Sequence, residues 1–274
     1  MLGSAIIVFR ETLEAALIIG VIAAATRGLP FRNAWLLAGI GAGVVGSLIV
    51  ASLTGQIAQL AEGAGQELFN ASVLGLAAAM LAGHNIWMAR HGVQLAMSAK
   101  QLGQEVVTGS RAMSALGVVI ALSVLREGSE TALFLYGLLA GGAESPTTVL
   151  SGGATGLFVG VIAGYGLYAG ILRVPVRLFF ALTSGLILLL AAAMASQAAR
   201  FLVQADVLPS LGNPLWNTSW LLDNTSVVGR FLHALVGYEA MPSGIQAVFY
   251  TATLTLILAG MWLFRVRPSS PFTT

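Results

Sequence analysis

The sequence predicts an all-α integral membrane protein with seven transmembrane helices. Hydrophobic residues make up 57% of its 274 residues and charged residues only 9%, whereas a soluble domain carries about 25% charged residues. The apolar runs are about 20 residues long and do not alternate with period two, which indicates helices rather than a membrane barrel. The chain contains no cysteine, which excludes disulfides, thiolate metal sites and iron–sulfur ligands.

Seven apolar segments follow one another in what we expect to be a single transmembrane domain, 1–274. The first lacks a basic region before it and is interrupted by Arg10 and Glu11, so we expect a retained helix rather than a cleaved signal peptide. The long outer connector at about 201–243 contains SWLLDNTSVVGRFLHALVG, which predicts an interfacial helix or a packed cap. A polar connector is expected at 90–111. The expected spans are about 2–26, 34–55, 68–89, 112–139, 148–171, 178–200 and 244–264.

Basic residues in the connectors predict the orientation of the helices. Nine lie after segments 1, 3 and 5 and in the C-terminal tail, whereas only Arg200 and Arg230 lie on the opposite side. By the positive-inside rule, the N-terminus is outside and the C-terminus is cytoplasmic. The nine residues are Arg27, Arg32, Arg90, Lys100, Arg111, Arg173, Arg177, Arg265 and Arg267.

An internal repeat relates the two halves of the chain. The stretch 5-AIIVFRETLEAAL-17 recurs as 121-ALSVLREGSETAL-133, with seven of thirteen positions identical at an offset of 116. Segments 2 and 5 match more weakly at an offset of 114, and segments 3 and 6 share AAAM. Because segments 1 and 4 cross in opposite directions, we expect an inverted 3+3 repeat, about 1–95 and about 110–203, followed by a seventh helix. Such repeats place substrate sites near the membrane midplane, which favours transport.

The RExxE pattern occurs once in each half. Glutamates three residues apart project from nearly one face of a helix, and the arginine is spaced to pair with the second of them. Each ionisable group inside a membrane costs about 2.5–3.5 kcal/mol, so four facing carboxylates predict a cage for a hard cation. The alternative is a pair of buried Arg–Glu bridges that lock the two helices together. The expected metal ligands are Glu11, Glu14, Glu127 and Glu130, and the expected supporting residues are Arg10 and Arg126.

The two motifs, RETLE and REGSE, resemble the REGLE signature of the high-affinity iron permease family of fungi and bacteria. The stretch 213-NPLWNTSWLLDNTSVVGRFLHALVGYEAMPSG-244 is similar to the family's sequence before its last helix, so the resemblance covers essentially the whole chain. It implies a multi-pass iron importer of the cytoplasmic (inner) membrane in which the four glutamates handle Fe2+ or Fe3+, with no permanent cofactor. Where this chain has Asn217, we expect relatives to carry an acid.

The same resemblance implies a periplasmic partner protein that oxidises or binds iron. In fungi this partner is a multicopper oxidase, and in bacteria it is a cupredoxin-like or peroxidase-like protein. The lipid bilayer is the other partner. A net charge of only +2 gives no reason to expect nucleic acid.

Five further residues are candidates for the ion pathway. His84 lies within segment 3 and is expected to be a ligand, a proton carrier or a satisfied hydrogen-bonding group. Gln197 occupies roughly the equivalent place in segment 6. Glu67, Asp223 and Glu239 lie on the outer side, where they raise the local cation concentration or are ordinary solvated loop charges.

Three other functions fit the sequence less well. A transporter of another divalent cation, such as manganese, would use the same carboxylates. An intramembrane phosphatase needs a cationic phosphate-binding loop, but Arg126 is followed by the anionic sequence EGSE, so we expect no enzyme activity. A purely structural subunit would not need buried charges. The glycine runs 39-GIGAG-43 and 152-GGATG-156 predict close helix packing rather than phosphate binding.

Overall fold

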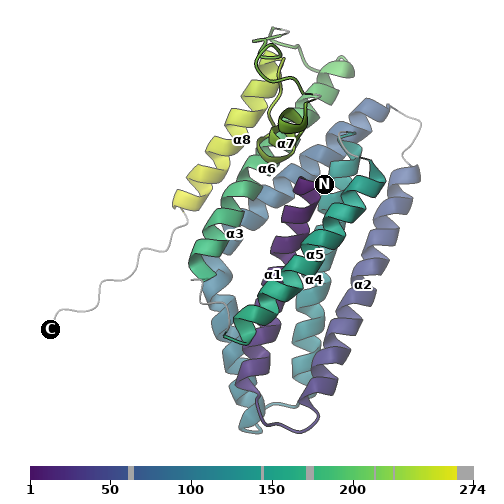
Figure 1. Cartoon of the computed structure of the whole chain (residues 1–274). Coiled ribbons are helices and arrows are strands. Elements are labelled where there is room, and N and C mark those ends of the chain that lie inside the picture. The colour runs from purple at the N-terminus through teal and green to yellow at the C-terminus, as the bar shows by residue number, and fades with distance from the viewer. Residues whose placement is uncertain (61–64, 143–144, 171–175, 213, 225, 264–274) are drawn as a thin grey trace, which may run out of the picture.

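The computed structural model describes residues 1–60, 65–142, 145–170, 176–212, 214–224 and 226–263. In these parts of the chain the backbone forms eight α-helices and no β-strand (Figure 1). Of the charges that predict orientation, Arg173, Arg265 and Arg267 lie outside the described residues, as do the side chains of Arg90, Arg177 and Arg230. The helices are α1 (Leu2–Ala25), α2 (Arg32–Leu60), α3 (Gln66–Val107), α4 (Ser114–Ala140), α5 (Pro146–Tyr168), α6 (Val176–Gln204), α7 (Val227–Val236) and α8 (Gly244–Leu263).

Five of these helices are long and apolar enough to cross a membrane, so the chain is a multi-pass membrane protein. Helices α1 and α4 differ from them because each carries the three charged residues of an RExxE motif. Large apolar side chains such as Leu48 of α2 and Phe158 of α5 are exposed on the outside of the bundle, as lipid-facing residues are. The five candidate spans are Arg32–Gln56, Gln66–Met88, Pro146–Tyr168, Ala181–Gln204 and Gly244–Leu263.

Each predicted apolar segment coincides with a helix, but the polar connector predicted at 90–111 is wrong. Helix α3 continues through most of that range and ends at Val107. The reason is amphipathicity: Ala99, Leu102 and Val106 pack in the core, while Lys100 is exposed. The polar residues therefore cover one face of a helix instead of forming a loop.

The connector 201–243 contains the short helix α7, in agreement with the predicted interfacial helix or cap. The Ser226 hydroxyl accepts a hydrogen bond from the backbone N–H of Gly229, which begins the helix. Gly237 ends it with φ +72°, a left-handed conformation that glycine adopts without strain. Tyr250 of α8 donates a hydrogen bond to the backbone oxygen of Val236, so α7 is held against the bundle.

Three helix pairs join different halves of the chain, while a fourth pair, α6 and α8, lies within the second half. Helix α1 packs along α5, α2 along α4, α3 along α6, and α8 along α6. Helices α1 and α4 run in opposite directions (Figure 1). Glycines allow the close approach: Gly43 of α2 lies against Ala121 and Val124 of α4, and Gly156 of α5 lies against Ala5 of α1. These contacts confirm the predicted packing role of the two glycine runs.

The contacts of these two helix pairs repeat one another. Gly39 lies against Gly117 and Ile120 of α4, and Gly152 lies against Met1 and Ser4 of α1. The contacted residues on α4, Gly117 and Ile120, come 116 positions after those on α1, Met1 and Ser4, and 116 is the offset of the sequence repeat. The contacting glycines, Gly39 and Gly152, are 113 positions apart. The sequence match between segments 2 and 5 has an offset of 114, so it differs by one position from the offset of 113 between these glycines.

Two buried apolar clusters lie toward the two ends of the bundle. On α1, Ile7 of the upper cluster is one turn before Glu11, and Ile22 of the lower cluster is two turns after Glu14. The RExxE motifs therefore lie between the clusters. We define the upper cluster by Ile7, Leu74, Ala77, Leu81, Phe134, Ile187 and Met194, and the lower cluster by Ile22, Leu36, Leu102, Leu116 and Ile120.

Candidate metal-binding site

Helices α1, α3 and α4 bring together, at the centre of the bundle, four side chains that could ligate a metal ion. The motifs occupy the middle of α1 and of α4, and α1 packs against both α3 and α4. One ligand atom from each of Glu11, His84, Glu127 and Glu130 lies within 4.8 Å of the others. Glu11, His84 and Glu127 are buried, whereas the Glu130 side chain is 17% exposed. The structure thus contains a Glu/His cluster with members from both motifs and from α3.

Each arginine pairs with both glutamates of its own motif. Arg10 donates a hydrogen bond of 3.1 Å to Oε1 of Glu11, and its other terminal nitrogen lies 3.0 Å from Oε1 of Glu14. Arg126 donates through Nε to Oε1 of Glu130 at 3.0 Å and lies 3.9 Å from Glu127. Burying a charged group without a partner is strongly unfavourable. The arginines therefore offset part of the cost of burying the four carboxylates.

The His84 ring lies between the two motifs. Its Nδ1 is 2.5 Å from Oε2 of Glu130 on α4, while its Nε2 is 3.4 Å from Glu14 and 3.9 Å from Glu11 on α1. The side chain is only 4% exposed. Of the five further candidates for the ion pathway, His84 is the one that the structure places among the glutamates.

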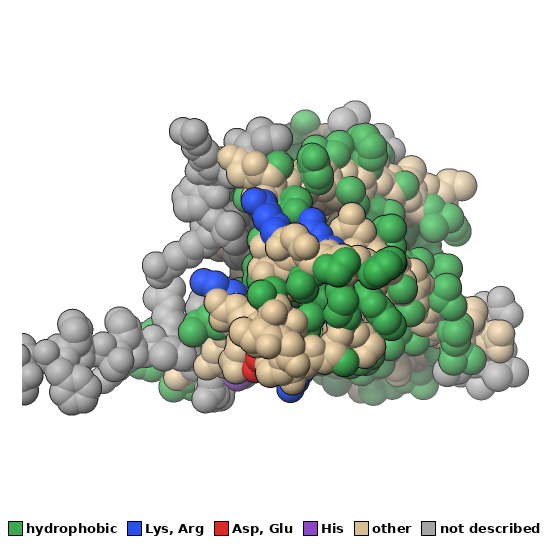
Figure 2. Space-filling model, turned by 90° about the horizontal axis from the view of Figure 1, so that it is seen from below, with side chains coloured by type: hydrophobic (Ala, Val, Ile, Leu, Met, Phe, Trp, Pro, Cys, Tyr) green, Lys and Arg blue, Asp and Glu red, His purple; other side chains and the backbone are tan. Residues whose placement is uncertain are grey.

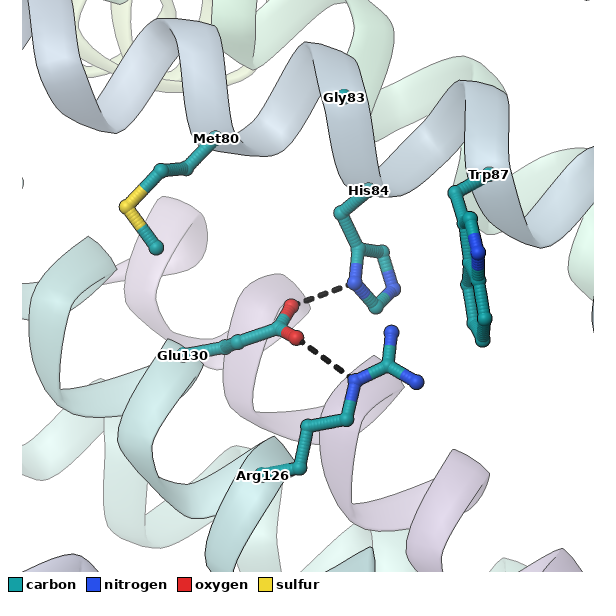
Figure 3. Close-up of a pocket in the computed structure, with 6 residues that line it drawn as sticks. All are labelled: Met80, Gly83, His84, Trp87, Arg126 and Glu130. Atoms are coloured by element: carbon teal, nitrogen blue, oxygen red, sulfur yellow. Dashed lines mark hydrogen bonds and ion pairs between the residues drawn. The ribbon is translucent and has the colours of Figure 1, made fainter.

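A pocket of about 280 Å³ lies beside these residues, between α3 and α4. Met80, His84 and Trp87 project from α3 toward Glu130 and Arg126 of α4 (Figure 3). The guanidinium carbon of Arg126 lies 4.1 Å from the centroid of the Trp87 ring, a cation–π contact. The sequence reasoning missed Trp87. Its position three residues after His84, on the same helix face, was the available signal.

Several carboxylate oxygens and the ring nitrogens of this group lack a hydrogen bond in good geometry, although some of them form ion pairs. Most buried polar atoms in proteins have a hydrogen-bond partner. Among the described residues, however, seven buried atoms of this group have none in good geometry, and the four carboxylates outnumber the two guanidinium groups. Oxygen and nitrogen lone pairs that converge with surplus negative charge fit a cation. The seven atoms are Oε2 of Glu11, both Oε atoms of Glu14, Oε2 of Glu127, Oε2 of Glu130 and both ring nitrogens of His84.

The other pathway candidates lie outside this cluster. Nε2 of Gln197 on α6 is 3.4 Å from Nε2 of His233 on α7, and Oε2 of Glu239 is 3.7 Å from Nδ1 of the same histidine. Glu67 is exposed in the first turn of α3, and Asp223 is exposed in the segment before α7. Gln197 and Glu239 thus share a neighbour under the α7 cap instead of joining the motifs.

Comparison with known proteins supports one family over the length of the chain. A sequence profile described as the iron permease FTR1 family matches residues 1–266. The ferrous iron permease EfeU of Yersinia pestis is 27% identical over 277 aligned residues, which cover 97% of this chain and 93% of that protein. The protein of the same name from Escherichia coli O157:H7 is 29% identical over 267 residues, covering 93% of each chain. No solved structure matches significantly.

Proposed function

Because the chain belongs to the iron permease FTR1 family, we propose that it imports iron ions through a cage of intramembrane glutamates. The observation that carries this proposal is the convergence of Glu11, His84, Glu127 and Glu130 from three helices to within 4.8 Å of one another. Glu14 belongs to the same cage through its contact with His84. The relatives are named ferrous iron permeases, which favours Fe2+ as the ion that is carried.

The membrane topology in this proposal has seven crossing helices in the cytoplasmic membrane, with α1 and α4 added to the five apolar spans. Their charges face the interior of the bundle, where they pair with one another. The N-terminus lies outside and the C-terminus lies in the cytoplasm. Basic side chains at the lower end of the bundle support this orientation (Figure 2), because cytoplasmic loops are rich in Lys and Arg. The described residues at this end are Arg27, Arg32, Lys100 and Arg111.

The two halves, about 1–95 and about 110–203, form an inverted repeat in a single transmembrane domain. The support is the exchange of equivalent contacts: α2 packs on α4 as α5 packs on α1, with the same offset of 116 between α1 and α4. The opposite directions of α1 and α4 agree with this relation (Figure 1). A site at the interface of inverted repeats near the midplane is typical of secondary transporters.

The transport cycle follows from the position of the cage between the two apolar clusters. Phe134 lies one turn above Glu130, and Ile120 lies two turns below Glu127, so apolar side chains separate the cage from either end. Iron reaches the cage when the upper cluster opens and leaves when the lower cluster opens. The membrane potential favours inward movement of a cation by about 2.3 kcal/mol per charge per 100 mV.

On the outer side, the acidic residues Glu67, Asp223 and Glu239 concentrate cations near the cap. A periplasmic protein that oxidises or binds iron is the partner that this family implies, and it would deliver the ion to this surface. An enzymatic role is disfavoured, because a cage of carboxylates repels the phosphate groups that an intramembrane phosphatase must bind.

Uptake of radiolabelled iron into proteoliposomes tests the proposal. We expect Glu14→Gln and Glu130→Gln each to reduce the initial rate of Fe2+ uptake at least tenfold, because each removes one negative charge from the cage. Glu105→Gln is the matched control, since Glu105 pairs with Arg111 at the partly exposed lower end of the bundle. Normal uptake by both cage variants would disprove the cage. Equal uptake of Mn2+ and Fe2+ by the native chain would instead identify a general divalent-cation transporter.

A further inference from the structure

We infer that His84 is a nitrogen ligand that makes the cage select transition-metal ions over Mg2+ and Ca2+. This inference rests on the proposed function, because it concerns the same site. His84 lies on α3, outside both RExxE motifs, so the sequence repeat does not account for it. It is the one nitrogen donor among the four metal-ligating residues that the described structure brings together.

The distances around Nε2 leave room for an ion shared with α1. Two ligand atoms that are each about 2.1 Å from the same metal ion lie about 3 to 4 Å apart. Nε2 is 3.4 Å from a carboxylate oxygen of Glu14 and 3.9 Å from one of Glu11, and it has no hydrogen-bond partner. A metal ion between these three atoms therefore needs only a small adjustment of side chains that already face one another.

The other ring nitrogen shows how the imidazole is oriented. Nδ1 is 2.5 Å from Glu130, whose other oxygen accepts a hydrogen bond from Arg126. Arg126 in turn lies over the Trp87 ring (Figure 3). A metal-binding histidine commonly has a carboxylate at its second nitrogen, and this partner orients the ring. Arg126, Glu130 and His84 form such a chain of contacts, which directs Nε2 toward α1.

The chemistry of the donor set explains the selectivity. Carboxylate oxygens alone suit Mg2+, Ca2+ and Mn2+, whereas imidazole suits iron and the later transition metals. Four glutamates without a histidine would thus discriminate poorly between iron and Mg2+ or Ca2+. In the competing interpretation, His84 only compensates the negative charge of the acids. Its replacement would then change the stability of the protein or its uptake rate, but not its preference among ions.

Competition experiments in proteoliposomes separate the two interpretations. The native chain, His84→Gln and His84→Asn would take up Fe2+ in the presence of increasing Mg2+ or Ca2+. We expect the competitor concentration that halves uptake to fall about tenfold or more in the His84 variants, on the scale seen when metal-site residues are changed. His91→Gln is the matched control, because His91 lies about two turns after His84 on the same helix and is not among the four clustered residues. It should behave like the native chain.

A spectroscopic measurement tests nitrogen ligation without relying on transport. The purified full-length chain, labelled with 15N-histidine, is loaded with Fe2+ and studied by pulsed EPR as the nitrosyl adduct. We expect a 15N-histidine coupling in the native chain and in His91→Gln, and its loss in His84→Gln. Absence of the coupling in the native chain would overturn the inference, as would unchanged selectivity in the His84 variants. Normal uptake by the Glu14 and Glu130 variants would overturn the cage itself, which is a separate outcome.

Discussion

Nδ1 of His84 lies 2.5 Å from Oε2 of Glu130, and this contact joins α3 to the motif on α4. The equivalent glutamate of the first motif, Glu14, lies on the other side of the ring, 3.4 Å from Nε2. One imidazole thus contacts both motifs, and the surroundings of the two motifs are not equivalent. Arg10 is fully buried, whereas the Arg126 side chain is 36% exposed and lies beside Trp87.

This asymmetry predicts different effects of the two arginines on stability. Arg10→Gln leaves Glu11 and Glu14 buried without their cation, so we expect it to lower the free energy of unfolding by about 3–5 kcal/mol. Arg126→Gln should lower the free energy of unfolding by less, because the Arg126 side chain lines a pocket and is partly exposed. Denaturation of the purified proteins in detergent measures both changes. Equal losses would contradict the difference in burial.

Neighbouring glycines of α2 provide a test of helix packing. A Cβ atom at Gly43 would lie 2.6 Å from the Val124 side chain on α4, whereas a Cβ atom at Gly41 would meet nothing within 4 Å. We expect Gly43→Ala to lower the free energy of unfolding by about 1–3 kcal/mol through overpacking. Gly41→Ala should be neutral or slightly stabilising, since alanine favours helix. If thermal unfolding shifts equally in both variants, the α2–α4 contact is not the cause.

The upper apolar cluster is predicted to block access to the cage from outside. Ala77 is buried in this cluster beside Gly137, and Phe134 packs in the same cluster. In an Ala77→Cys background, we expect Phe134→Ala to raise the rate of labelling by a membrane-impermeant thiol reagent several-fold. Leu116→Ala, in the lower cluster, should leave this rate unchanged. Equal rates with and without Phe134 would show that the cluster is no barrier.

The proposed orientation can be checked directly, because the native chain contains no cysteine. Ser110 is exposed in the turn between α3 and α4, and Asn217 is exposed in the segment before α7. With an impermeant maleimide on intact cells, we expect labelling of Asn217→Cys but not of Ser110→Cys. Permeabilised cells should show labelling of both. The opposite pattern in intact cells would reverse the topology.

Helix content and motif geometry were readable from the sequence because both are local. Runs of apolar residues specify each helix, and a spacing of three places Glu11 and Glu14, or Glu127 and Glu130, on one face. The sequence does not predict the full length of α3, because the polar residues of its second half are also typical of a loop. The structure shows that Ala99 and Leu102 of this part pack in the core. Amphipathic helices cannot be distinguished from polar connectors by composition alone.

The sequence by itself determined that this protein is helical and membrane-embedded, and that two matched RExxE motifs lie inside it. Only the tertiary structure decided that His84 reaches both motifs, that Gln197 faces His233 instead, and that Arg10 is buried while Arg126 is partly exposed. The physical reason is that periodicity fixes which residues share a helix face. The depth at which different helices meet depends on close contacts between distant segments, such as those made by Gly43 and Gly156.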